Sequence, residues 1–166
     1  RRGGRGKSHR GSGWPLVNSS AVSNHPPRVL LTSSSPDPVH TTLIIPGLQF
    51  EVKTTITRYD KADIVLPVAA RITNAGLHNK TIIVRSSSDV NVHAFDNDHS
   101  NGAGFLVLPS SLIGTEYRIP NYIPSFDSYP SFFTITALYD GTSVHIVTKE
   151  SQEASCVNLQ QFESYR

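Results

Sequence analysis

The sequence contains no methionine, a single cysteine and no long run of apolar residues. No stretch approaches the roughly 18 to 20 consecutive apolar residues of a membrane-spanning helix, and no apolar segment of a signal peptide is visible. We therefore expect no membrane insertion within this stretch. The lone Cys156 excludes an internal disulfide framework, and its thiol is expected to be buried or paired outside this stretch.

Acidic residues are absent from the first 13 residues, which hold five of the 15 Lys and Arg residues. The rest of the chain then has 15 − 5 = 10 basic and 13 acidic residues, a net charge of −3. The folded part therefore offers no electrostatic case for binding nucleic acid. We expect residues 1–27 to be a disordered Arg/Gly-rich head and linker, although such a run can also contact RNA or anionic surfaces.

Helical periodicity is absent too, whereas period-two alternation is frequent. In "SDVNVHAF", Val90, Val92 and Ala94 fall on one face and the polar residues on the other. β-Branched residues fill these runs, and turn sequences such as "SSSPDP" and "LYDG" separate them. The pattern predicts an all-β fold of antiparallel strands, with a core that includes Val90, Val92, Leu106, Leu108, Val144 and Ile146.

A Val-His dipeptide that recurs at a regular spacing suggests internal repeats. Val39-His40, Val92-His93 and Val144-His145 follow one another at intervals of 53 and 52 residues. Each pair follows a turn, and we expect it to lie in the second arm of a hairpin whose first arm is "RVLLTSSS", "TIIVRSSS" or "FTITAL". Units of about 52 residues suit propeller-like blades, and two such units equally suit a β-sandwich. The third unit stops early, so we expect the domain over 28–166 to be incomplete at its C-terminus.

Residues 28–166 resemble the N-terminal domain of the IgG Fc-binding protein family, which is associated with mucus. The resemblance rests on "SDVNVHA", then "FLVLP" from Phe105, then "IGTEY" to Tyr117, and further on "FTITALYDGTSVHIVT" and "VNLQQFESY". It implies a secreted or cell-surface module, commonly joined to further extracellular domains, with protein partners. The family is not known for catalysis, and no family binding residues can be carried over to positions here.

A polar stretch precedes "GFLVLP". Asp96, Asp98, Ser100 and Asn101 offer hard oxygen ligands at short spacing, which would suit calcium. Counted from Asp96, however, the sixth and twelfth positions lack the Gly and Glu of an EF-hand. A solvated loop is the plainer interpretation. His93, Asp96 and His99 could also supply zinc ligands, but His93 has counterparts in His40 and His145, which favours a place on a strand.

Aromatic residues concentrate in "YRIPNYIPSFDSYPSFF", between three prolines. Tyr117, Tyr122, Phe126 and Tyr129 would make good contact anchors, since aromatic side chains lose little entropy on binding. The alternative is a connector whose rings fill a gap between repeats. Two glycosylation sequons, at Asn18 and Asn79, fit a secreted glycoprotein.

The sequence has no nucleophile elbow, zinc-protease motif or phosphate-binding loop. We therefore expect a binding module rather than an enzyme, and no required cofactor. One hypothesis is an extracellular adhesion or mucus module that binds protein, for example an immunoglobulin, or glycan. The alternative is a calcium-dependent binding module that uses the Asp96–Asn101 loop.

Overall fold

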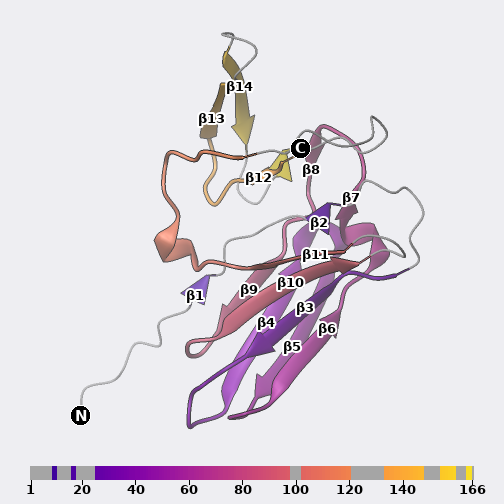
Figure 1. The fold of residues 1–166 in the computed structure, drawn as a ribbon, viewed down its shortest axis with the longest axis vertical. Helices are drawn as coiled ribbons and strands as arrows, with labels where there is room; N and C mark the ends of the chain where they lie inside the picture. The colour runs from indigo at the N-terminus through magenta and orange to yellow at the C-terminus, as the bar shows by residue number, and fades with distance from the viewer. Residues whose placement is uncertain are drawn as a thin grey trace.

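The computed structural model describes residues 9–10, 16–17, 25–97, 102–120, 133–147, 154–159 and 164–165 (Figure 1). Within these ranges the regular structure is β-strand, apart from three single-turn 3-10 helices. All strand pairs are antiparallel except one short parallel pair. The predicted all-β class is confirmed. Within the same ranges no helix is both long and apolar enough to cross a membrane.

Two four-stranded sheets make up the main body. The β3 sheet has the order β11-β10-β3-β6, with β3 (Arg28–Thr32), β6 (Lys61–Val65), β10 (Asn91–Asn97) and β11 (Gly102–Leu106). The β4 sheet has the order β1-β9-β4-β5, with β1 (His9–Arg10), β4 (Val39–Ile45), β5 (Phe50–Ile56) and β9 (Ile83–Ser86). Strand β1 falls within the predicted head, and the boundary at residue 28 stays a prediction.

Smaller sheets and 3-10 turns complete the structure. The pairings are β12 (Ile135–Thr136) and β8 (Leu77–His78) on either side of β15 (Ser164–Tyr165), β13 (Thr142–Val147) with β14 (Ala154–Leu159), and β2 (Leu16–Val17) with β7 (Arg71–Ile72). The turns are η1 (Pro46–Leu48), η2 (Val68–Ala70) and η3 (Ser110–Leu112). Strands β12 to β14 gather at the upper end of Figure 1, away from the lower end of the two main sheets.

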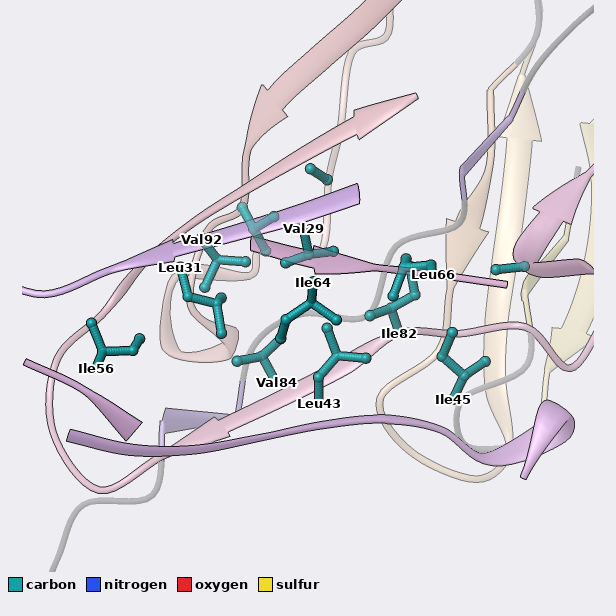
Figure 2. Packing of buried hydrophobic residues seen from close by; sticks show 13 residues of the cluster. Val29, Leu31, Leu43, Ile45, Ile56, Ile64, Leu66, Ile82, Val84 and Val92 are labelled. Carbon is teal, nitrogen blue, oxygen red and sulfur yellow. The ribbon is translucent and has the colours of Figure 1, made fainter. Parts of the chain in front are cut away.

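The core lies between the two main sheets (Figure 2). Val29, Leu31 and Val92 point into it from the β3 sheet, and Leu43 and Val84 point into it from the β4 sheet. All five are at most 6% exposed. Alternate residues of each strand thus meet the facing sheet, which is why a period of two marks these segments. The described core is a β-sandwich, one of the two predicted architectures.

The strands pair differently from the predicted hairpins. β3 and β4 are consecutive, yet β3 pairs with β10 and β6 while β4 pairs with β5 and β9. β9 and β10 are likewise split between the two sheets. The segments 33–38 and 87–90 are therefore arches that cross from one sheet to the other, and the expected pairing of "RVLLTSSS" and "TIIVRSSS" with the strands that follow them is wrong. The third expected pair fails as well, because β12 pairs with β15 and β13 with β14.

The two arches exchange partners. The first strand of one arch pairs with the second strand of the other, through Leu31 opposite Val92 and Leu43 opposite Val84. The arches also bond directly: Ser33 Oγ donates to Asp89 O at 2.8 Å, and the His40 N–H donates to Ser87 Oγ at 3.0 Å. The 53-residue spacing between the first two Val-His dipeptides thus relates two arches of one sandwich, which exchange strand partners and are called interlocked below.

A third crossing lies beside them. Residues 57–60 connect β5, at the edge of the β4 sheet, to β6, at the edge of the β3 sheet. Val39 lies opposite Ile56, and Thr32 lies opposite both Lys61 and Asn91. The registers therefore place segments 87–90, 33–38 and 57–60 at the same end of the sandwich, called here the arch end.

The predicted core was partly wrong. Val92 is buried and Val90 packs against the core, but Leu106 and Leu108 are 52% and 53% exposed. Strand β11 is at a sheet edge, and Leu106 lies opposite His93, on the face away from the buried Ala94. Val144 and Ile146 are only half-buried in the separate β13–β14 pair.

A leucine pair checks this assignment. Leu43→Ala should reduce the free energy of unfolding by about 2 to 5 kcal/mol, since it removes a fully buried side chain. Leu108→Ala, at an exposed leucine, should change it by no more than about 0.5 kcal/mol. Urea unfolding followed by far-ultraviolet circular dichroism measures both, and equal losses would contradict the described core.

Candidate functional site

A buried ion pair lies next to the β10–β11 connection. Arg71, on β7, donates from Nε and Nη2 to Oδ1 of Asp96 at 2.8 and 2.6 Å, and both side chains are 4% exposed. Arg71 Nη2 also donates to the carbonyl oxygen of His25 at 2.6 Å, and Lys80 Nζ donates to the carbonyl oxygen of Arg71. The pair joins β7 to β10 across 25 residues of sequence. Because both charged groups are buried, their mutual attraction offsets part of the free energy that is lost when they are removed from water.

This geometry bears on the predicted calcium loop. Asp96 lies within strand β10, and its Oδ1 is engaged by Arg71, while its buried Oδ2 has no hydrogen-bond partner in the described structure. Asp98 and Asn101 lie outside the described residues. In the described ranges no group of three or more His, Cys, Asp or Glu side chains is placed to hold a metal. Calcium binding stays a prediction, and the pairing with Arg71 accounts for Oδ1 of Asp96 without it.

Exposed apolar side chains concentrate in the segment after β10. Seven of the 13 large hydrophobic residues exposed in the described ranges fall within 105–119: Phe105, Leu106, Leu108, Leu112, Ile113, Tyr117 and Ile119. The segment begins on edge strand β11, stays attached through the Val107 N–H bond to Val92 O, and then leaves the sheet through η3. Successive residues of β11, such as Phe105 and Leu106, point to opposite faces of the sheet, so these side chains are a concentration along the chain that favours contact with a partner. We call these seven residues the 105–119 surface.

Strand β10 extends this apolar character over the outer face of the β3 sheet. The rings of His93 and Phe95 stack with centroids 6.4 Å apart, and both are half-buried. Phe95 lies opposite Gly104, where an added Cβ would come within 2.8 Å of the Phe95 ring. Glycine at position 104 therefore leaves room for the Phe95 ring over β11.

The predicted aromatic anchors are described only at their start. Tyr117 is 64% exposed, and its hydroxyl donates to Gly114 O at 2.8 Å. Tyr122, Phe126 and Tyr129 lie outside the described residues. Their role in binding stays a prediction, and Tyr117 is the one of the four that belongs to the 105–119 surface.

Of the two predicted glycosylation sites, only Asn79 lies within the described residues. Asn18 lies outside the described residues, while Asn79 is exposed beside the η1 turn. A Cβ on Gly47 would overlap the carbonyl oxygen of Asn79, so the two segments touch through backbone. The exposed amide of Asn79 is compatible with glycosylation, which stays a prediction.

The comparisons with known proteins concern the same part of the chain. Residues 103–165 match the family model described as IgGFc binding protein. No curated protein and no solved structure matches the chain. The match covers fewer than half of the 166 residues, begins within β11 and contains the 105–119 surface. The resemblance is confirmed over this part, and it suggests an extracellular binding module.

Sequence reasoning missed two elements. Arg71 lies in "PVAARIT", with nothing nearby to mark it as a partner of Asp96, and the exposure of Leu106 and Leu108 was hidden because apolar runs were assigned to the core. The exposure of Leu106 and Leu108 could have been anticipated. The apolar residues that follow them, Leu112 and Ile113, lie beyond Pro109 in a segment without strand alternation.

The ion pair yields a stability test. Asp96→Asn should lower the free energy of unfolding by about 3 to 5 kcal/mol, because it removes the carboxylate that pairs with the buried guanidinium of Arg71. The loss should be the same with millimolar calcium and with a chelator. Denaturant unfolding in both conditions is the measurement.

The double variant Arg71→Met, Asp96→Leu is the control. It should recover most of the stability, since removing both charges removes both desolvation costs. A calcium-dependent rise in wild-type stability that disappears in Asp96→Asn would instead favour the calcium hypothesis.

Proposed function

We propose that this chain is a protein-binding module of an extracellular adhesion or mucus-type protein, and that it docks its partner on the 105–119 surface. The observation that carries the proposal is the coincidence of two independent features. Within the described ranges, the segment with the highest concentration of exposed apolar side chains also lies within residues 103–165, which match the IgGFc binding protein family. Buried apolar residues are accounted for by the stability of the fold, whereas exposed apolar residues at this density favour contact with a partner.

The chemistry of the surface favours protein over glycan. Five of the seven residues, Leu106, Leu108, Leu112, Ile113 and Ile119, are aliphatic and offer neither rings for stacking on sugars nor groups that hydrogen-bond hydroxyls; Phe105 and Tyr117 are the exceptions. Desolvating such side chains against a complementary apolar patch contributes about 25 cal/mol for each Å² buried. The edge position of β11 adds a second route, since an extended segment of a partner can align along a sheet edge.

The first partner to test is the Fc fragment of immunoglobulin G, which the family description names. Secretion and placement among other extracellular domains are part of the same proposal. They are supported by the family match and by the exposed position of Asn79 in its sequon.

Binding of immobilised Fc measured by biolayer interferometry tests the proposal. Leu106→Asp should weaken binding at least about tenfold, because a charge in the centre of an apolar contact must be desolvated. The matched control is Leu77→Asp: Leu77 is 55% exposed against 52% for Leu106, but lies on β8 in another sheet. It should bind as wild type does. Absence of wild-type binding would exclude Fc as the partner, and equal losses in both variants would exclude this surface.

A further inference from the structure

The 57–60 turn at the arch end carries a tyrosine in an unfavourable backbone conformation. Tyr59 has φ of 67°, in the left-handed region, and it is the third residue of a turn closed by the Asp60 N–H bond to Thr57 O at 3.1 Å. Glycine and asparagine adopt this conformation far more readily than a bulky aromatic residue does. The turn itself therefore gives no reason for tyrosine.

The Tyr59 side chain is also hardly buried by the rest of the domain. Tyr59 is 89% exposed, the most exposed of the large hydrophobic residues in the described ranges. A ring that is neither buried nor favoured by its backbone is expected where something outside the domain uses it.

The turn nevertheless holds the ring in place. The guanidinium carbon of Arg58 lies 4.8 Å from the centroid of the Tyr59 ring, so one face of the ring is covered by a cation. Asp60 Oδ1 accepts the Lys61 N–H at 2.7 Å, which fixes the end of the turn next to β6. Tyrosine and arginine are the residues most enriched among those that dominate protein contacts. A contact between the two side chains before binding reduces the entropy that is lost when they are ordered in an interface.

The position of the turn suits the start of the 105–119 surface, at Leu106. Leu106 lies opposite His93, His93 opposite Leu30, and Leu30 opposite Asp63. Across the sheet, Leu106 is therefore in register with Asp63. Asp63 is two residues from Lys61, at which β6 begins after the turn. The order β11-β10-β3-β6 separates the two edges by three strand spacings, about 14 Å. A typical interface of about 800 Å² per partner is wide enough to cover both.

We propose that the Arg58–Tyr59 pair is a second anchor for the protein that docks on the 105–119 surface. The projecting ring enters an apolar recess of that partner, and Arg58 faces a carboxylate at the rim of the recess. This inference rests on the proposed function and adds to it a specific contact from a turn outside the family match. A projecting tip fits a recess in a protein, which favours a protein contact over a glycan.

The decisive variant is Tyr59→Asn, which suits the left-handed conformation but lacks the ring. It should bind immobilised Fc at least about tenfold more weakly than wild type, while its melting temperature stays the same or rises. Tyr59→Phe, which keeps the ring, should retain binding. Tyr139→Asn is the matched control, because Tyr139 is 71% exposed at another turn; it should bind normally.

The outcomes separate the two proposals. Loss in Tyr59→Asn with a preserved melting temperature supports the anchor, whether or not Leu106→Asp also loses binding. Normal binding by Tyr59→Asn beside weakened Leu106→Asp overturns the anchor alone, and no binding by the wild type overturns both. A clear fall in the melting temperature of Tyr59→Asn shows a structural role and overturns the anchor. So does a loss that is seen with glycosylated Fc and disappears with enzymatically deglycosylated Fc, which would show that the ring contacts sugar.

Discussion

The exchange of strands between two arches is the constraint on which the rest of the described structure depends. Each arch sends one strand to each sheet, and the two strands of an arch pair with strands of the other arch and not with each other. The pairs that hold the sandwich together therefore join residues far apart in the chain, such as Leu31 and Val92, separated by 92 − 31 = 61 positions. Closing such distant contacts costs loop entropy before packing compensates for it. The benefit is that one set of pairings fixes both sheets and the core between them.

That constraint also places the surfaces. Because β10 is held by β3, its other edge is available to β11, and β11 carries the apolar segment to the edge of the sheet. Because β5 and β6 flank the first arch, the turn between them projects at the same end. The residues proposed to bind thus lie on segments with little role in the core, supported by strands that have a large one. This division lets a contact surface vary while the sandwich stays constant.

Period-two alternation predicted the main strands because a strand between two sheets, or between a sheet and water, must alternate whatever its partners are. It could not predict the partners. "SSSPDP" and "SSSD" contain the same turn-forming residues whether the chain folds back beside itself or crosses to the facing sheet. The choice depends on partner strands about 40 to 65 residues away. The same distance hid the role of Asp96. Within "HAFDNDH" it resembles a loop carboxylate, and only Arg71, brought near by the fold, makes it a buried ion pair. Of the predicted contact residues, Tyr117 is exposed as expected, and Tyr59 had no marker beyond the turn-like "TRYD".

Interlocking has a consequence for the continuity of the backbone. The two arches are joined through residues 73–76, of which Thr73, Asn74 and Ala75 are exposed and carry none of the pairings that build the sandwich. A break in this connection would leave a piece with β3 to β6 and a piece with β9 to β11, each incomplete in both sheets. Every strand of the first arch would still find its partner in the other piece, so the sandwich can in principle be rebuilt from two separate polypeptides. The domain is in this sense a pair of mutually complementary fragments that happen to share one chain.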